Sequence, residues 1–520
     1  MFKRPTVDEV IAVAEKLGIH LSPDEAELYQ RLLVTQLHSF DAFVQSRTVE
    51  EVAPSLLYGA REPGYRPSAK EDPLGAWLWR CRIEGSGKGV LAGKTVSYKD
   101  HVAVAGMPLT FGSFVMEGFI ADFDATIVTR ALEAGATITG KNAMTGFVGG
   151  FGFGGTIGDY DAPKNPHDAR HVTGGSSSGS AVAVASSQVD ISFGGDQGGS
   201  IRIPAAWSGT VGLKPTFGLI SHFGIAFGSD QSIDFTGPIT RTVEDAAAAL
   251  QAVAGYDGYD PRQGREVPER LDVLTNLANG VKRLRLGIVE EGFQGAEPDV
   301  SSLVMAATDV LADAGAVVSK VSIPEHLLVR PAVAAVAAEG ARAVLETGIF
   351  GAFAKTYYPA SLIAAINKMW AHEADLMKPG LKFGYLLAEF SRQNYHGRVY
   401  AKAHNLRPAF VKAYDQALVD VDVLVMPTCI LKAFEVGGPD DYLKSLENDI
   451  TIGERTMAVQ NTLPFNYTGH PALAVPCGKS QGLPVSMQLV GRYFDDPRLL
   501  QVAYAFQQSV DWDDIVGVLS

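Results

Sequence analysis

Glycine and serine crowd into two short segments of the chain, residues 174–181 and 195–204. Glycines in such tight clusters indicate backbone that approaches a neighbour closely or takes φ values that a side chain would forbid. The serines between them are then expected on strained turns, with their hydroxyls and the neighbouring N–H groups pointing the same way. Acyl transfer needs its nucleophile and its oxyanion donors in this arrangement. The two segments are therefore the first candidate for a catalytic site.

Three chemical interpretations of these segments compete. Residues 175–179 satisfy G-x-S-x-G, the nucleophile elbow of α/β-hydrolases with Ser177 as nucleophile, but residues 168–173 are not the buried strand that must precede an elbow. A phosphate-binding loop would need a Gly-Lys-Ser/Thr ending, which does not follow here. The third interpretation takes one serine as nucleophile and another as proton relay, with a separate base, and it is the one we retain.

Lys99 is the candidate base, because it follows a strand predicted over residues 95–98. A lysine at the end of an apolar strand can be desolvated, which lowers the pKa of its amine. Part of the amine is then neutral and can accept a proton.

Two other sequence patterns are weaker evidence for a functional site. Residues 150–155 match the dinucleotide fingerprint G-x-G-x-x-G, but the residues after them cannot open a helix well, so the pyrophosphate would lack its binding dipole. We predict a loop at the pocket mouth, with Phe147, Phe151 and Phe153 as candidate substrate walls; simple packing within the loop is the alternative. The eleven histidines form no HExxH, so neither a metal nor another cofactor is expected.

Charge and composition narrow the class of partners. The 520 residues carry a net charge of -14, which argues against nucleic acid or an anionic membrane as partner. The three cysteines are widely spaced and form no C-x-x-C, which fits structural thiols in a reducing compartment. The N-terminal residues show no signal-peptide pattern, and no apolar run approaches a membrane span. We therefore expect a cytoplasmic protein.

The pattern of elements changes twice along the chain. Residues 6–51 read as helices and 62–72 as a linker; from residue 91 strands and helices alternate, with a clear βαβ unit over 284–323. Residues 331–420 break the alternation with alanine-rich helical sequence. We predict a helical N-terminal extension over 1–72, an α/β core formed by 73–330 and 421–520, and a helical inserted subdomain over 331–420.

Residues 99–215 resemble the amidase signature family closely. The resemblance lies in the Lys99-Asp100 pair, the Gly-Gly-Ser-Ser element from Gly174, Gly-Gly-Ser-Ile-Arg-Ile-Pro-Ala-Ala from Gly198, and residues 211–216, and it continues through 422–428, 469–472 and 482–485. It implies an α/β fold, a mixed twisted β-sheet flanked by helices. Gln197 stands where threonine is common, and the surrounding sequence is similar to that of a bacterial subgroup that acts on small aliphatic and aromatic amides.

The resemblance also implies a role for each site residue. Ser200 would be the nucleophile, Ser176 the bridging serine after a cis peptide bond, and Lys99 the base. Backbone N–H groups next to the nucleophile would hold the oxyanion, and two charged residues would brace the glycine turn. The candidate oxyanion residues are Gln197, Gly198 and Gly199, and the candidate braces are Asp196 and Arg202.

These inferences together predict a serine hydrolase that cleaves the C–N bond of small amides or amide-like substrates through an acyl-enzyme. The alternatives are the catalytic subunit of a glutamyl-tRNA amidotransferase complex and a catalytically silent ligand-binding relative. Helical N-terminal extensions serve dimerisation in some members of the family, so we expect a homodimer; a helical pad on its own core is the other interpretation.

Overall fold

The computed structural model describes residues 2–46, 54–57, 61–144, 160–348, 356–377, 379–436, 447 and 457–518. The chain forms two compact units, Met1–Ser55 and Leu56–Ser520. Residues 61–72, predicted as a linker, belong to the second unit: Arg61 ion-pairs with buried Asp124, and Tyr65 forms a β-bridge with Arg80.

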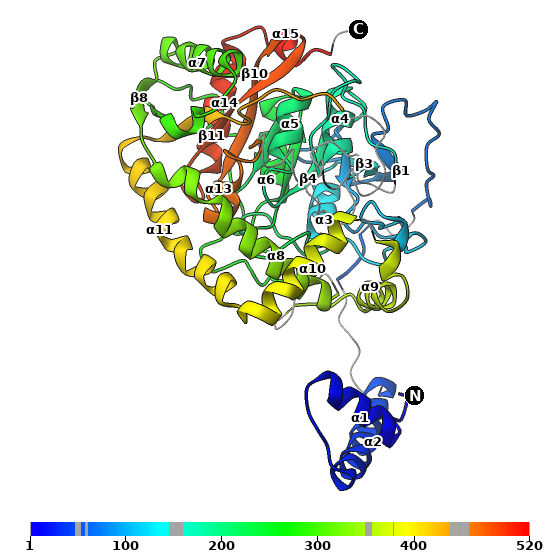
Figure 1. Cartoon of the computed structure of the whole chain (residues 1–520). Helices are drawn as coiled ribbons and strands as arrows, with labels where there is room; N and C mark the ends of the chain where they lie inside the picture. Colours follow the sequence, from blue (N-terminus) through cyan, green and yellow to red (C-terminus); the bar gives the residue numbers. More distant parts are fainter. Residues whose placement is uncertain are drawn as a thin grey trace. The chain divides into compact units, whose positions relative to one another are not determined.

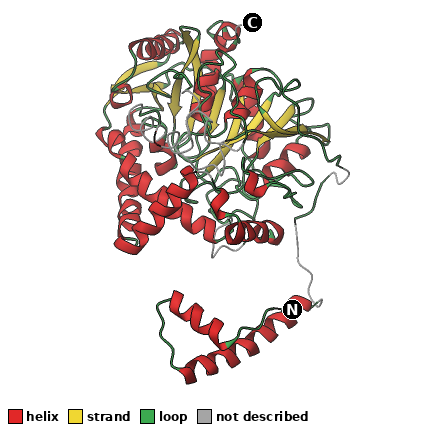
Figure 2. Cartoon of the chain, turned by 45° about the vertical axis from the view of Figure 1, so that its right-hand side comes forward, coloured by secondary structure: helices red, strands yellow, loops and turns green. Residues whose placement is uncertain are grey.

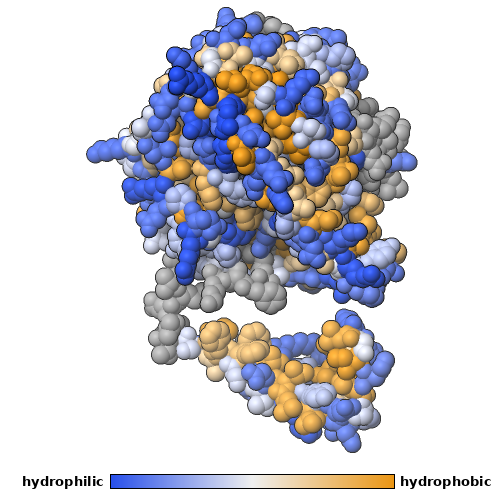
Figure 3. Space-filling model, turned by 90° about the vertical axis from the view of Figure 1, so that its left-hand side faces the viewer, coloured by the Kyte–Doolittle hydropathy of each residue, from blue (hydrophilic) through white to orange (hydrophobic). Residues whose placement is uncertain are grey.

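The first unit is a pair of helices, α1 (Val7–Lys16) and α2 (Pro23–Gln45). Each begins at a capping box, Thr6 with Glu9 and Ser22 with Glu25, which satisfies backbone N–H groups that the first turn leaves free. Among the described residues of this unit only three apolar side chains are buried, whereas Val13, Leu17, Leu32, Phe40, Phe43 and Val44 are exposed. Figure 3 shows apolar side chains gathered on the visible face of this helix pair.

The second unit is built on a mixed sheet in the order β1-β3-β2-β4-β6-β5-β10-β11-β9-β7-β8 (Figures 1 and 2). Its strands are β1 (Trp77–Glu84), β2 (Thr95–Lys99), β3 (Thr137–Asn142), β4 (Ile191–Asp196), β5 (Val211–Lys214), β6 (Phe235–Thr240), β7 (Arg285–Val289), β8 (Val317–Val321), β9 (Val423–Pro427), β10 (Ala472–Ser480) and β11 (Leu483–Val490). β2 pairs in parallel with β3 and β4, and β7 in parallel with β8 and β9; the other neighbours are antiparallel.

Helices cover both faces of this sheet. Successive strand residues point to opposite sides, so one strand contributes to the apolar contacts on both faces. In β9, Val423 and Val425 belong to one apolar cluster with residues of α3 (Thr126–Glu133), α6 (Val243–Val253), α7 (Pro298–Asp313) and α14 (Asp496–Gln508). Leu424 and Met426 belong to another, with residues of α11 (Arg398–Asp420) and α13 (Leu463–Thr468). Two short helices, α4 (Ser178–Ala185) and α5 (Arg202–Ser208), pack into a third cluster with strand residues. The predicted α/β fold is confirmed, including the parallel unit β7-α7-β8.

The inserted segment is helical. It contains α8 (Arg330–Glu346), α9 (Ala360–His372), α10 (Pro379–Tyr395) and α11, which gather along one edge of the unit in Figure 1. Apolar residues of α8 and α11 form a cluster with Ile233, in the loop that precedes β6. In the same loop, Asp234 accepts a hydrogen bond from Gln197 of the second serine segment. The helical segment therefore packs against a loop that contacts the candidate site. Over the described ranges the structure also has α15 (Trp512–Val516) and four short 3₁₀ helices.

Candidate active site

Lys99 is the last residue of β2, inside the sheet between β3 and β4. Its side chain is fully buried, and its Nζ donates to Ser176 Oγ at 2.7 Å and to the carbonyl of Gly195 at 3.4 Å. The predicted base and the predicted bridging serine, 77 residues apart in sequence, are therefore in direct contact.

Burial has a large effect on this lysine. Desolvation lowers the pKa of Lys99 to about 7, against the opposing effect of the carboxylates of Asp234 and Asp196. Near neutral pH a substantial fraction of the amine is therefore uncharged. An uncharged amine next to a serine hydroxyl can accept its proton.

The first serine segment is held by close backbone contacts. The Gly175–Ser176 peptide bond is cis, as the resemblance implies. Gly174 has φ +74, and a Cβ there would lie 3.0 Å from Pro204 and from the Trp207 ring, so a side chain is excluded. Ser176 follows, 5% exposed.

Ser177 is occupied by structural contacts. Its hydroxyl donates to the carbonyl of Gly195 and accepts from the N–H of the same residue, both at 3.2 Å. A nucleophile needs a free hydroxyl beside a base, whereas the hydroxyl of Ser177 links the start of α4 to β4. The elbow interpretation of residues 175–179 does not apply.

Ser200 lies half-buried immediately before Ile201 and α5. Its carbonyl accepts from the N–H of Ser177 at 3.3 Å, so the two serine segments adjoin. Gly199 has φ +134, and a Cβ at this position would lie 2.5 Å from Thr462 Oγ1. Only glycine allows the turn 197–200 to come this close to Thr462, the residue before α13.

Asp196 and Arg202 form a fully buried, two-pronged ion pair, with Nε–Oδ2 and NH2–Oδ1 distances of 3.0 Å. The same carboxylate accepts from the N–H groups of Gly199 at 2.6 Å and Ile201 at 3.1 Å. Burial alone would raise the pKa of Asp196, but Arg202 and Asn466 bring it to about 2. The ionised pair therefore spans the glycine turn and fixes its shape.

The hydrogen bonds of the glycine turn affect which backbone N–H groups can serve as oxyanion donors. The N–H of Gly199 donates to Asp196, so it can bind an oxyanion only if this hydrogen bond is given up. Gln197 and Gly198 keep their place as candidate donors, together with the N–H of Ser200 itself. The Gly198 carbonyl accepts from Thr462 Oγ1 at 2.6 Å, which holds this peptide unit in one orientation.

Several polar residues around the site escaped the sequence analysis. Asn466 of α13 donates to both the carbonyl and the carboxylate of Asp196, and Gln488 of β11 accepts from Arg202 at 2.9 Å. Asp234 accepts from the side chain of Gln197 at 2.6 Å. Each is an ordinary polar residue in its local sequence, so spacing carried no signal that could have found it.

His101 is fully buried behind the site. One ring nitrogen lies 3.4 Å from the carbonyl of Lys99, while Nε2 has no hydrogen-bond partner among the described residues and lies 2.3 Å from where a Cβ at Gly195 would be. Burial holds the pKa of His101 well below its usual range, so the ring is neutral. It acts as a packing wall behind β4.

Other candidate features lie elsewhere. Phe147, Phe151 and Phe153, the candidate pocket walls, lie outside the described residues. Within the described ranges, no three His, Cys, Asp or Glu side chains gather as a metal site would require. Among the helices in that same part of the chain, none combines the length and apolar content needed to cross a bilayer.

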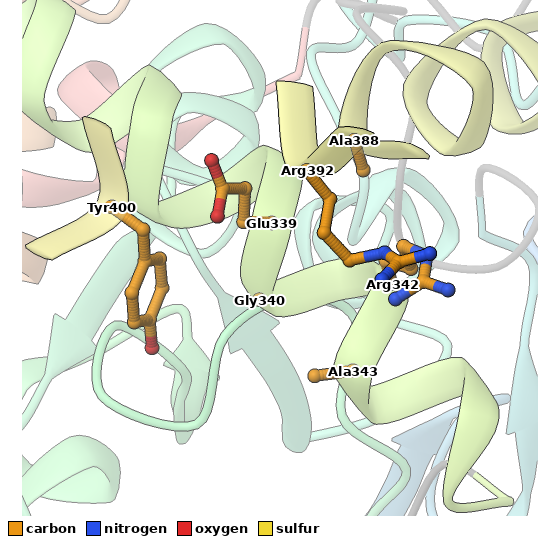
Figure 4. A pocket seen from close by; sticks show the side chains of 7 residues that line it. All are labelled: Glu339, Gly340, Arg342, Ala343, Ala388, Arg392 and Tyr400. Carbon is orange, nitrogen blue, oxygen red and sulfur yellow. The ribbon is translucent and has the colours of Figure 1, made fainter. Parts of the chain in front are cut away.

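A cavity of about 250 Å³ lies among α8, α10 and α11, and neither the two serines nor Lys99 lines it (Figure 4). Its two arginines are ion-paired with Glu389, at 2.6 Å from Arg342 and 2.9 Å from Arg392. Because its lining includes none of the candidate catalytic residues, the cavity is separate from the candidate site. Its lining residues are Glu339, Gly340, Arg342, Ala343, Ala388, Arg392 and Tyr400.

Comparison with known proteins agrees with this geometry. The profile of the Amidase family matches residues 78–500. An enantioselective amidase of Rhodococcus rhodochrous is 38% identical over 90% of this chain and 89% of its own length. A glutamyl-tRNA(Gln) amidotransferase component from Picosynechococcus is 34% identical over 93% of this chain and 97% of its own length. The solved peptide amidase of Stenotrophomonas maltophilia superposes with a TM-score of 0.64 at 29% identity, covering 81% of this chain and 83% of that one.

A sheet with helices on both faces, a buried lysine against a serine, and a family match over most of the length define an enzyme of the amide-hydrolase class. The chain belongs to the amidase family and acts on amide C–N bonds.

The buried ion pair leads to a stability prediction. We expect Arg202→Met to destabilise the fold by about 3–5 kcal/mol, because it leaves the Asp196 carboxylate buried without its counter-charge. The control is Arg170→Met, which breaks an ion pair whose arginine is 78% exposed and should leave the stability almost unchanged. Urea unfolding measures both; an equal loss in the two variants would contradict this account of the brace.

Proposed function

We propose that Lys99, Ser176 and Ser200 are the catalytic residues of this enzyme. Neutral Lys99 takes a proton from Ser176, which takes one from Ser200, and the Ser200 oxygen attacks the amide carbonyl. The contact of 2.7 Å between Lys99 Nζ and Ser176 Oγ in a fully buried site is the single observation that supports this relay best.

The remaining steps follow from the same groups. Backbone N–H groups of Gln197, Gly198 and Ser200 would hold the charge that develops on the carbonyl oxygen. The relay then returns a proton to the leaving nitrogen, which departs as ammonia or an amine and leaves an acyl-enzyme. Water enters, gives its proton to the relay and releases the carboxylic acid. No metal is needed, because the lysine supplies the base.

The substrates we propose are small carboxamides, anilides, carbamates or hydrazides. All four present a carbonyl bonded to nitrogen, and one acyl-enzyme route handles each of them. The similarity to an enantioselective amidase over 90% of the chain supports this class. The choice among them depends on pocket walls, for which Phe147, Phe151 and Phe153 stay our candidates.

The first test removes the proposed nucleophile and base. We expect Ser200→Ala to lower kcat/KM on a panel of the four substrate types by more than about 10³-fold, beyond the loss of a single oxyanion donor, and Lys99→Ala to come close to it. Ser509→Ala, at an exposed helix end, and Lys94→Ala, on the same segment as Lys99, are the matched controls and should keep activity.

A fluorophosphonate probe should label the wild type and not Ser200→Ala. Wild-type activity in folded Ser200→Ala would discard the mechanism, and an unlabelled, inactive wild type would favour a silent ligand-binding relative.

The second test is the pH dependence of the reaction. Because the pKa of Lys99 is lowered to about 7 by burial, and because its neutral form is the base, kcat/KM should fall as the pH drops through about 7. The rate is expected to be constant above this limb until another group titrates. A rate that stays unchanged from pH 8 to pH 5 would exclude Lys99 as the base.

We propose further that the enzyme is a cytoplasmic homodimer whose partners are its small substrates, without nucleic acid or membrane. The exposed apolar side chains of α1 and α2 support self-association, and the free thiols of all three cysteines fit a reducing compartment. Membership of a glutamyl-tRNA amidotransferase complex stays the second candidate, since a component of one such complex is 34% identical over 97% of its length.

Light scattering and purification separate these candidates. We expect the full chain to run as a dimer of itself and to hydrolyse amides alone. Phe43→Glu with Val44→Glu, at side chains 79% and 66% exposed on α2, should give an active monomer. Val419→Glu, comparably exposed on α11, is the control and should stay dimeric. Obligate co-purification with a second polypeptide, and inactivity without it, would favour the amidotransferase complex.

A further inference from the structure

Asp234 gathers three N–H donors at the edge of the candidate site. Its carboxylate accepts from the side chain of Gln197 at 2.6 Å, from His222 Nε2 at 3.1 Å and from the N–H of Gly228 at 2.8 Å. Asp234 is 1% exposed and His222 2%. Three contacts from separate segments therefore hold this side chain in one orientation.

His222 supports the Asp234 carboxylate. Its Nε2 faces the carboxylate, and its Nδ1 lies 3.1 Å from the carbonyl of Ile225. The ring also stacks on Phe227, with ring centroids 4.5 Å apart at an angle of 9°. These contacts fix the position of the ring.

Asp234 acts on two groups of the proposed catalytic site, Gln197 and Lys99. Through its hydrogen bond it holds the side chain of Gln197, whose backbone N–H is a proposed oxyanion donor. It also exerts the largest electrostatic effect on Lys99 of any charged residue, one that favours the protonated amine.

Other charged and titratable groups lie around Lys99 and His222. Asp234 and Asp196 act on Lys99, and neutral His101 packs beside it. Around His222 lie Asp234, His101 and Asp260, and Asp260 accepts from the backbone N–H of His222 and ion-pairs with Arg262. These groups come from β2 and the turn after it, from β4, and from the loops before β6 and after α6.

We propose that Asp234, held by His222, is a positioning residue of this enzyme, which orients the Gln197 oxyanion donor and acts through its negative charge on the Lys99 amine. The proposal rests on the proposed function of the serines and Lys99. It assigns His222 the role of a support that keeps the Asp234 carboxylate in place.

The experiment compares pH profiles of kcat/KM for three variants of the full chain. Asp234→Asn removes the negative charge but keeps an acceptor for Gln197, so the acid limb should move to lower pH by about half a unit or more. His222→Gln keeps the negative charge of Asp234 and changes only its support, so the limb should stay in place. Gln197→Met keeps the backbone donor and loses its anchor, so kcat should fall about tenfold with the limb unmoved.

Asp190→Asn is the matched control. Asp190 is partly buried and accepts from Thr95 at the start of β2, the other end of the strand that carries Lys99, so its loss should leave the limb in place. Circular dichroism and thermal unfolding show which variants are folded. For a variant too slow for turnover, the pH dependence of fluorophosphonate labelling of Ser200 reports the same limb.

A limb that moves to lower pH in Asp234→Asn and stays in place in His222→Gln and Gln197→Met would support the proposal, since damage to packing alone does not move the limb in one variant only. An unmoved limb in folded Asp234→Asn, or an unchanged kcat in folded Gln197→Met, would overturn it. Full activity of Lys99→Ala would instead reject the proposed function, so the two failures are distinguishable.

Discussion

Burial of one lysine amine is the constraint on which the rest of the site depends. Lys99 ends a central strand of the sheet, where water is excluded and the charged form of the amine is disfavoured. Its partner Ser176 is brought within 2.7 Å by a backbone segment that glycine alone allows. The strand therefore supplies both the place and the chemistry, because the same desolvation that accompanies core packing leaves the amine able to accept a proton.

Buried charge of the opposite sign stabilises the turn that carries Ser200. Asp196 joins the N–H groups of Gly199 and Ile201 to Arg202, which continues to Gln488 on β11 and Asn466 on α13. Arg202 and Asn466, 264 residues apart in sequence, thus meet in one network. A buried charge without its partner costs several kcal/mol, so such a network holds together only when every member is in place. This requirement explains how so glycine-rich a turn can keep one shape.

The sequence predicted the βαβ unit, the strand before Lys99 and the helical start of the chain, because apolar periodicity and caps are local signals. It missed β1 and β4: every residue of β4 is buried, and β1, at the edge of the sheet, shows no clean alternation of buried and exposed residues. The position of Ser177, with both hydrogen-bonding capacities used by Gly195, was equally hidden. Local pattern specifies elements better than it specifies the partners of a hydroxyl.

Residue types and their order by themselves determined the class of chemistry: clustered glycines and serines with a distant lysine, arranged as in the amidase family. Only the tertiary structure decided which groups are free to act. It commits the Gly199 N–H to Asp196, gives Gln197 its anchor at Asp234, and sets His101 as a wall behind the site. The physical reason is that hydrogen-bond partners and desolvation depend on contacts between segments far apart in the chain, which no local spacing encodes.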